Sequence, residues 1–430
     1  MRVAIYTLGC KVNQYETQAL ETELERRGHT LVPFTGEADA YIINTCTVTA
    51  VSDQKSRQTI RQARKRAPRA VVAVCGCYAQ TAPEAVRALE VDLVMGTGER
   101  MAFLDALEDL ARARQAQPLV RVDDALRRRT YERLSAGGLE GRTRAMLKVE
   151  DGCVNFCTYC IIPYARGPIR SLPLADAVCE AKRLAGEGYR ELVLTGIEIS
   201  SWGADFRDGS ALIDLVEALC AAAPECRVRL GSLEPRTVTE EFCRRAAALP
   251  NLCPHFHLSL QSGCDATLRR MGRKYDCARY YESVKLLWDF FDRPGITTDL
   301  IVGFPGETEE EFAQTLAFLS RCAFSAMHIF PYSRRSGTPA ASMPGQCPNA
   351  VKQARARQAA QLAGEMRRAW LERWVGRTLS VLFEEEKDGL WRGHAPNYTE
   401  VLAPGSGLHN VICDVEITGV REDGLLGRLR

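Results

Sequence analysis

Short apolar runs alternate with longer amphipathic segments throughout the first 113 residues. The apolar runs are rich in β-branched residues and have the length of strands, whereas the segments between them carry apolar side chains at helical spacing. The predicted strands are residues 2–7, 40–44, 71–74 and 92–95, and the predicted helices are residues 16–27, 53–67, 83–89 and 100–113. This alternation predicts an α/β domain over residues 1–113, with a doubly wound parallel sheet covered by helices on both faces.

The same alternation returns in residues 143–345, where it repeats six times. The predicted strands are residues 145–149, 191–195, 227–230, 255–260, 296–302 and 326–330, and the predicted helices are residues 176–187, 211–222, 239–248, 276–290 and 307–321. Six units predict a partial (β/α)6 barrel related to the eight-stranded α/β barrel. In that architecture the reacting groups lie on the loops that follow the strands.

Three other segments complete the chain. Residues 114–142 have little apolar periodicity and include Arg127, Arg128 and Arg129, so we expect a solvated linker. Residues 346–377 are expected to contain a basic helix, because seven Lys and Arg side chains lie within residues 351–377. Residues 378–430 contain short strands between Gly and Pro turns, which predict a small all-β barrel.

The amino-acid composition is typical of a globular protein. A chain of 430 residues with 46% hydrophobic and 26% charged residues is expected to form two or three globular domains. No apolar run is long enough to cross a membrane, and the apolar stretch at the N-terminus is too short for a signal peptide, so a cytoplasmic protein is expected. Seventeen cysteines in a chain of this length favour metal ligation and buried thiols over a disulfide scaffold.

Cys153, Cys157 and Cys160, which we call the second cysteine trio, have the spacing C-x3-C-x2-C directly after the first predicted barrel strand. A cubane iron–sulfur cluster takes four thiolates, one for each iron. Three neighbouring thiolates therefore predict a [4Fe–4S] cluster with one iron open to a small molecule. The alternative is a zinc site, but zinc requires a fourth ligand and the nearest histidine in the sequence is His255.

Cys10, Cys46 and Cys77, the first cysteine trio, each fall just beyond a different predicted strand of the N-terminal sheet. Ligands of open parallel sheets bind at that edge, so these residues predict a second three-thiolate cluster. The alternative is that they are small residues in tight turns. Cys75 ends an apolar run and is expected to point into the sheet layer, which leaves Cys77 as the ligand.

Several residues on the predicted barrel loops are candidates for binding a nucleoside-like cofactor. Glycine after the second strand allows close backbone approach, and hydroxyl, carboxylate and amide groups after later strands suit a ribose or an amino-acid group. An aromatic ring between two cysteines of the second trio suits an adenine. The candidates are Tyr159, Gly196, Glu198, Ser232, Glu234 and Gln261. Each has an ordinary alternative as a capping or packing residue.

An open iron can hold S-adenosylmethionine (SAM) beside a reducing cluster, where one electron yields a 5′-deoxyadenosyl radical. This radical removes hydrogen from an unactivated C–H bond, so the chemistry is expected to lie on the cofactors and not on a catalytic side chain. A carbon radical then needs an added atom, and a second cluster with a free iron can carry sulfur. Two trios in one chain therefore predict sulfur insertion.

Two basic segments predict a polyanionic partner. Residues 54–69 contain seven Lys and Arg and no acid, and residues 351–377 are similarly basic. Either could equally be a solvated helix face. Together with a small β-barrel, however, they favour RNA held through its phosphates, with an unstacked loop base presented to the site.

Nearly the whole chain resembles the radical-SAM methylthiotransferase family. The resemblance rests on the second cysteine trio and on four other segments, which are residues 8–13 (LGCKVN), 44–46 (NTC), 76–80 (GCYAQ) and 260–263 (LQSG). It implies that the first cysteine trio holds an auxiliary cluster, that SAM serves both as methyl donor and as radical source, and that the tail is an RNA-binding TRAM module.

Residues 9–16 (GCKVNQYE) resemble the MtaB-type branch of the family. That branch adds a methylthio group to C2 of N6-threonylcarbamoyladenosine at tRNA position 37, so the resemblance implies a tRNA anticodon loop and an electron donor such as flavodoxin or ferredoxin as partners. The alternatives are the branches that modify isopentenyladenosine in tRNA or an aspartate of a ribosomal protein. A non-catalytic iron–sulfur RNA-binding sensor is an alternative of another class.

Overall fold

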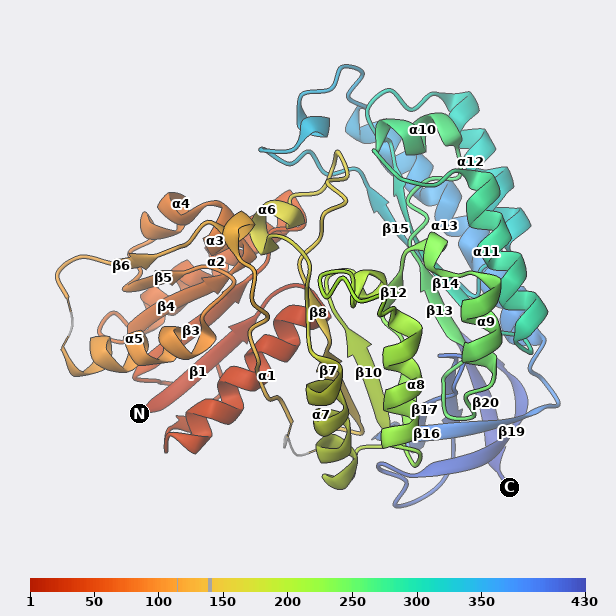
Figure 1. Cartoon of the computed structure of the whole chain (residues 1–430), viewed down its shortest axis with the longest axis horizontal. Helices are drawn as coiled ribbons and strands as arrows, with labels where there is room; N and C mark the ends of the chain where they lie inside the picture. The colour runs from red at the N-terminus through yellow and green to blue at the C-terminus, as the bar shows by residue number, and fades with distance from the viewer. Residues whose placement is uncertain (114, 138–140) are drawn as a thin grey trace.

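The computed structural model describes residues 1–113, 115–137 and 141–430. The N-terminal part is a six-stranded, fully parallel sheet in the order β2-β1-β3-β4-β5-β6 (Figure 1). Its strands are β1 (Arg2–Thr7), β2 (Thr30–Leu31), β3 (Ala40–Thr45), β4 (Val71–Gly76), β5 (Leu93–Met95) and β6 (Leu119–Arg121). Its helices are α1 (Lys11–Arg26), α2 (Ala50–Arg66), α3 (Cys77–Thr81), α4 (Pro83–Arg87) and α5 (Arg100–Arg112).

Helices cover both faces of this sheet, as the alternation predicted. Leu20, Leu24 and Phe103 from α1 and α5 pack on one face, whereas Ile60 and Val86 from α2 and α4 pack on the other. The central strands β3 and β4 are buried along their whole length. A sheet buried on both faces selects continuous apolar strands, which is why these strands were readable in the sequence.

The segment predicted to be a solvated linker contributes to the sheet. Residues Leu119–Arg121 form β6, which pairs with β5 in parallel register. Arg128 is mostly buried, because its guanidinium binds Asp123 and donates to the Thr97 hydroxyl at 2.7 Å. The prediction of a purely solvated linker was therefore wrong for this part, and residues 114 and 138–140 of that segment lie outside the described residues.

The central part is an open parallel barrel built from two sheets, β11-β10-β7 and β12-β13-β14-β15. Its strands are β7 (Arg144–Lys148), β10 (Glu191–Thr195), β11 (Arg227–Arg229), β12 (Ser232–Leu233), β13 (His255–Leu258), β14 (Gly295–Val302) and β15 (Ala326–Pro331). The third predicted strand is thus divided into β11 and β12, and the sheet is interrupted there. A single parallel bridge between Val228 and Leu252 continues the strand order across the interruption.

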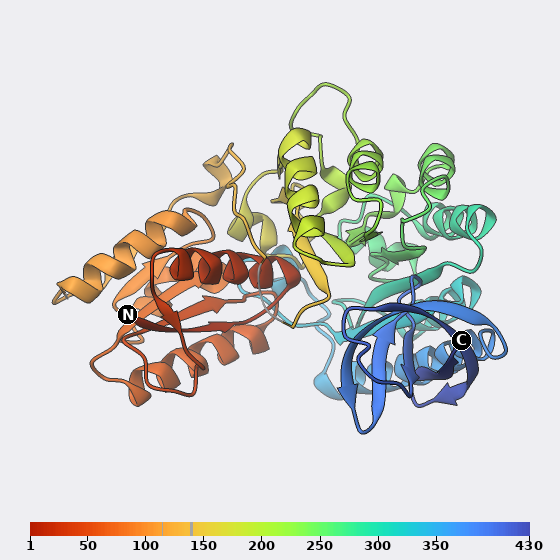
Figure 2. The ribbon, with the colours of Figure 1, turned by 90° about the horizontal axis from the view of Figure 1, so that it is seen from below.

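Helices surround the barrel strands on the outside, as Figures 1 and 2 show. They are α7 (Leu174–Gly186), α8 (Leu212–Ala222), α9 (Glu240–Ala247), α10 (Asp265–Arg270), α11 (Cys277–Phe290) and α12 (Glu309–Cys322). The short helix α6 (Ile162–Arg166) lies instead against α3 of the N-terminal part. One large hydrophobic core joins the strands to this outer layer and includes Leu192, Val216, Phe256 and Leu319. A short antiparallel pair, β8 (Glu150–Asp151) and β9 (Arg170–Ser171), brackets the loop that contains the second cysteine trio.

A long helix and a small barrel complete the structure. The helix α13 (Asn349–Glu372) packs on β14 and β15 and leads into a closed five-stranded barrel in the order β16-β17-β18-β20-β19. The barrel strands are β16 (Thr378–Lys387), β17 (Leu390–His394), β18 (Glu400–Ala403), β19 (Ile412–Arg421) and β20 (Gly424–Leu429). The all-β prediction is confirmed, while the basic helix ends before residue 377. Among the described residues, no helix is both long and apolar enough to span a bilayer.

Candidate functional site

The first cysteine trio gathers at one edge of the N-terminal sheet. Cys10, Cys46 and Cys77 follow β1, β3 and β4, which lie side by side in the sheet. Burial is the main reason that the pKa of Cys77 is raised to about 12; the guanidinium of Arg166 opposes this shift, and the neighbouring thiols of Cys10 and Cys46 add to it. Burial also raises the pKa of Cys46. Thiols in such surroundings need a cationic partner to become thiolates, and a bound metal supplies one.

Gly9 allows the loops of this trio to approach each other. Its φ angle is +103°, a region that residues with a side chain rarely adopt. A Cβ atom at this position would lie 2.7 Å from Sγ of Cys46 and 3.3 Å from Nδ2 of Asn13. The glycine is therefore required both by the backbone conformation and by the close packing of the Cys10 and Cys46 loops.

The second cysteine trio lies on the loop after β8. Burial is the main cause that raises the pKa of Cys153 to about 12 and that of Cys160 to about 11, and the neighbouring thiol of Cys157 contributes to both shifts. Nη1 of Arg273 donates to Sγ of Cys157 at 3.3 Å. Tyr159, between the ligands predicted for this cluster, meets Phe304 edge to face with ring centroids 6.4 Å apart.

The donor set of each trio consists of three thiols, which suits an iron–sulfur cluster. The ligands of a cubane each bind a different iron and therefore remain separated from one another. Which ligands hold a cluster stays a prediction.

A buried ionic network joins the helix that follows Cys10 to the segments on either side of the second cysteine trio. Glu16 on α1 accepts from Arg100 at 2.6 Å and from Lys148 at 3.0 Å, and it also forms an ion pair with Arg166. Lys148 binds Asp151 at 2.7 Å. All five side chains are almost completely shielded from solvent. Three buried cations surround two buried carboxylates, and their ion pairs join the N-terminal sheet to the first strand of the barrel.

A second contact joins the same two parts beside Cys46. Arg335, from the loop after β15, donates to the Thr47 hydroxyl and forms an ion pair with Asp53. The hydroxyl of Ser333 accepts from the backbone N–H of Ala50 at 3.1 Å. The loop that carries Cys46 is therefore held by the far edge of the barrel as well as by its own sheet.

A cavity of about 820 Å³ lies where the three parts of the chain meet. The N-terminal part contributes Cys10, the barrel contributes Gly196 and Asp299, and the C-terminal barrel contributes Asn397 and Tyr398. This volume falls within the range of small-molecule sites, roughly 300–1,000 Å³. The cavity, called the central cavity below, is where a ligand can contact Cys10 and the barrel loops together. Among the described residues, no other cysteine of either trio lines it.

Two of the six predicted cofactor contacts line the central cavity. Ser232 is exposed there, and Gly196 approaches the barrel wall so closely that a Cβ atom would lie 2.8 Å from Oε2 of Glu150. That carboxylate oxygen accepts from the backbone N–H of Glu198 at 2.7 Å. Burial raises the pKa of Glu150 well above its usual range, and its side chain holds the loop after β10 through this hydrogen bond.

The other four candidates have local structural partners. Glu198 and Glu234 each cap a 3-10 turn, accepting from the backbone N–H groups of Ser200 and Arg236 at 3.1 and 3.0 Å. Gln261 has a φ of +70° and bridges to β14 through its backbone. None of Tyr159, Glu198, Glu234 and Gln261 is among the described residues lining the central cavity, and their cofactor roles stay predictions.

Several lining residues were not found from the sequence. His255 and His257 occupy alternate positions of β13 and both face the cavity, where His257 forms an ion pair with Asp299 at 3.4 Å. Their spacing could have predicted this position, because alternate side chains of a barrel strand point into the barrel. Two polar residues two positions apart on such a strand therefore indicate a polar site inside it. Tyr398 comes from a turn of the C-terminal barrel, and no local pattern predicted its position.

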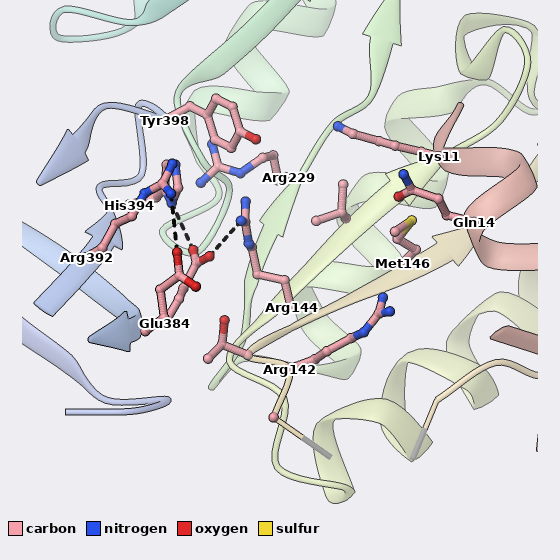
Figure 3. A pocket seen from close by; sticks show the side chains of 14 residues that line it. Lys11, Gln14, Arg142, Arg144, Met146, Arg229, Glu384, Arg392, His394 and Tyr398 are labelled. Atoms are coloured by element: carbon pink, nitrogen blue, oxygen red, sulfur yellow. Dashed lines mark hydrogen bonds and ion pairs between the residues drawn. The ribbon is translucent and has the colours of Figure 1, made fainter. Parts of the chain in front are cut away.

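Lys11 lines both the central cavity and an adjoining pocket of about 550 Å³, called the side pocket (Figure 3). Its side chain extends from the first turn of α1 toward Arg229 and Tyr398. The Lys11 side chain is exposed to the cavity, yet the surrounding protein excludes enough water to lower the pKa of its ammonium group. The sequence indicated Lys11 only as part of the segment 8–13 (LGCKVN) and not as a residue that lines a cavity.

The two basic helices differ in how their charges are used. On α2, Arg61 and Lys65 are exposed along a shallow groove of about 520 Å³. On α13, Arg355 is buried against Glu307 at 2.7 Å, and Arg367 donates to backbone carbonyls of the barrel and of residue 423. Arg355 and Arg367 of α13 are therefore used in contacts within the protein, and Arg367 joins the central barrel to the C-terminal barrel. The outer face of α2, in contrast, is available to a polyanion.

Comparison with known proteins agrees with this geometry. The model of "Uncharacterized protein family UPF0004" matches residues 2–96, and that of the "Radical SAM superfamily" matches residues 147–319. Threonylcarbamoyladenosine tRNA methylthiotransferase MtaB of Bacillus subtilis is 38% identical over 94% of this chain and 90% of its own length. The chain belongs to the radical-SAM methylthiotransferase family, in its MtaB-type branch.

Other relatives of the methylthiotransferase agree with this assignment. A tRNA-2-methylthio-N(6)-dimethylallyladenosine synthase of Oleidesulfovibrio alaskensis is 38% identical over 88% of this chain and 82% of its own length. The radical S-adenosylmethionine methyltransferase TsrM from Kitasatospora setae shares the fold, with a TM-score of 0.57 and 19% identity over 79% of this chain and 75% of that chain. The enzyme uses SAM and [4Fe–4S] clusters, as its family does.

Proposed function

We propose that this enzyme adds a methylthio group to C2 of N6-threonylcarbamoyladenosine at position 37, next to the tRNA anticodon. The observation that carries the proposal is the meeting of Cys10, from the first cysteine trio, with the barrel loops at one cavity, in a chain that shares 38% identity with MtaB of Bacillus subtilis. Five relatives with the MtaB name are 31–39% identical to this chain over 89–98% of its length.

Each cysteine trio is proposed to hold one [4Fe–4S] cluster. Cys153, Cys157 and Cys160 would hold the SAM-binding cluster, and the first cysteine trio would hold the auxiliary cluster. When bound, these groups supply a 5′-deoxyadenosyl radical and the sulfur that is transferred. Support comes from the desolvated thiols of Cys77 and Cys153, whose raised pKa values fall when a metal ion accepts the thiolate.

The side chains of the protein are proposed to position and shield the reactants. The Gly196 loop, held by Glu150, would let the backbone approach SAM, and Ser232 would offer a hydroxyl in the same cavity. The other four candidates would support the residues that contact SAM; they are Tyr159, Glu198, Glu234 and Gln261. The Glu16 network would keep the two cluster loops at a fixed separation, because a buried charge cluster resists rearrangement.

The remaining partners follow from the same chemistry. The outer face of α2, with Arg61 and Lys65, and the C-terminal barrel are proposed to hold tRNA phosphates while the loop base enters the central cavity. A low-potential protein such as flavodoxin or ferredoxin is proposed as the electron donor, and the cytoplasm, where tRNA is modified, as the place of action.

The proposal is tested by digesting bulk tRNA from a deletion strain and from the same strain carrying this gene. We expect 2-methylthio-N6-threonylcarbamoyladenosine to disappear in the deletion and to return on complementation, while the unmethylthiolated nucleoside accumulates. Loss of the dimethylallyl product instead would assign the enzyme to the other tRNA branch. Unchanged methylthio nucleosides would overturn action on tRNA.

A further inference from the structure

Lys11 is a cation without a counterion at the junction of two cavities. It lines both the central cavity and the side pocket, together with His394 and Tyr398. Within residues 1–113, 115–137 and 141–430, no carboxylate forms an ion pair or hydrogen bond with its ammonium group. Lys11 is also the first residue of α1, where a positive charge opposes the helix dipole. Local stability therefore does not explain a lysine here.

Two carboxylates near Lys11, those of Glu191 and Glu384, are already paired with other cations. Glu191 binds Arg229 through two hydrogen bonds of 2.6 and 2.9 Å. Glu384 accepts from Arg144 at 2.8 Å and lies 2.9 Å from Nδ1 of His394. These pairs occupy Arg229 and Arg144, whereas Lys11 lines the same pocket as a cation available to an anionic ligand (Figure 3). Arg142 and Arg392 line the side pocket as well.

The wall opposite Lys11 is rigid. The ring of Tyr398 stacks between His255 and His394, with centroid separations of 4.8 and 5.0 Å, and the guanidinium of Arg229 lies 4.8 Å from the same ring. Tyr398 is held at a φ of +66°, which a bulky residue adopts only when the surroundings enforce it. Both ring faces are covered, so Tyr398 shapes the pocket and does not offer a free surface for a stacked base.

The chemistry of the target base places an anion beside Lys11. On adenine, C2, N1 and N6 share one edge, so a base that presents C2 to the cluster site of Cys10 presents its N6 substituent to the same region. A threonylcarbamoyl substituent ends in a carboxylate, whereas an alkyl substituent carries no charge. Lys11 follows Cys10 directly and has a flexible four-carbon stem that ends in a point charge.

We propose that Lys11 binds the carboxylate of the N6 substituent and thereby selects the threonylcarbamoyl-bearing adenosine. This inference rests on the function proposed above and adds the residue that determines substrate specificity. Arg229 and Arg144 act behind it as positioning residues, since their own charges are neutralised by Glu191 and Glu384.

The test compares two anticodon stem-loop RNAs on the reconstituted full-length enzyme. One carries N6-threonylcarbamoyladenosine, and the other carries the carboxamide analogue, which has the same shape and no charge. We expect wild type to prefer the carboxylate RNA roughly 10- to 100-fold in kcat/KM, as for a hydrogen bond to a charged group. Lys11→Met should abolish this preference, and Lys11→Arg should keep most of it.

Comparison within one preparation separates recognition from cluster loss, because a lower cluster content affects both RNAs equally. Equilibrium binding of the two RNAs gives a readout independent of turnover, and the preference in affinity should vanish in Lys11→Met. Lys285→Met, on the exposed face of α11, is the matched control and should retain the wild-type preference.

The outcomes distinguish this inference from the function on which it rests. If Lys11→Met loses the same factor on both RNAs in turnover and in binding, Lys11 does not recognise the carboxylate, although the proposed function stands. If wild type prefers neither RNA but methylthiolates both, the inference is wrong in the same way. If wild type methylthiolates neither, the proposed function is wrong and the role of Lys11 is overturned with it.

Discussion

Arg166 and Glu16 form an ion pair between the two segments that follow the cysteine trios. Nη2 of Arg166 lies 3.2 Å from Oε2 of Glu16, and both side chains are shielded from solvent. The same nitrogen donates to Oδ1 of Asn13 at 2.7 Å, and Asn13 in turn donates to the backbone carbonyl of Thr45 at 3.0 Å. One guanidinium thus connects the loop after Cys160 to the loops of Cys10 and Cys46.

Replacing this guanidinium should weaken the whole assembly. Arg166→Met leaves Glu16 and Asp151 with fewer cations in a buried site, so we expect the free energy of unfolding to fall by about 3 kcal/mol. Chemical denaturation monitored by tryptophan fluorescence measures the change. The matched control is Arg112→Met, whose side chain is 74% exposed in its pair with Asp109, and it should cost less than about 0.5 kcal/mol. Equal midpoints for the two variants would contradict a structural role of the network.

A methyl group on Gly9 should damage the first cysteine trio selectively. Gly9→Ala places a Cβ atom 2.7 Å from Sγ of Cys46, so we expect reconstituted iron to fall to about half while reductive SAM cleavage persists. Gly28→Ala is the control, because Gly28 also has a positive φ, +80°, but has nothing within 4 Å of the added atom. Iron content is measured by iron counting, and SAM cleavage is measured as 5′-deoxyadenosine formed. Full iron content in both variants would refute the prediction.

The outer face of α2 should contribute to RNA affinity through phosphates. In the double variant Arg61→Gln/Lys65→Gln, the slope of log affinity against log salt should become shallower by between about 1 and 2, since each lost phosphate contact contributes roughly 0.7–0.9. Binding of full-length tRNA across a salt series measures this slope. Lys182→Gln/Lys285→Gln removes two exposed charges from α7 and α11 and should leave the slope unchanged; a similar change in both variants would indicate a nonspecific effect of net charge.

The strands of this fold were readable because burial on both faces imposes continuous apolar runs. β1, β10 and β14 begin and end within one or two residues of their predicted bounds. The start of α1 was missed because Cys10 gives no side-chain cap and the first turn holds no acid, so the usual signals of a helix start are lacking. β6 has only three residues, which is too short for periodicity to register.

The candidate site was predictable only where the chemistry is local. The spacing of the second cysteine trio and the position of the first trio after three strands are properties of short segments. The Glu16–Arg166 pair joins residues 150 positions apart in the sequence, and Tyr398 reaches the central cavity from another barrel. Such contacts depend on how the three parts pack. Glu198 and Glu234 were readable as polar loop residues, but their capping geometry was not.

The division of labour between the two trios is tested most directly by anaerobic reconstitution of Cys157→Ala and Cys46→Ala, with iron, 5′-deoxyadenosine and methylthiolated RNA measured on each. Both variants should hold about half the iron of wild type, because each loses one of two cubanes. Cys157→Ala should cleave no SAM, whereas Cys46→Ala should cleave SAM and transfer no sulfur. Equal loss of SAM cleavage and sulfur transfer in both variants would contradict two separate clusters with separate tasks.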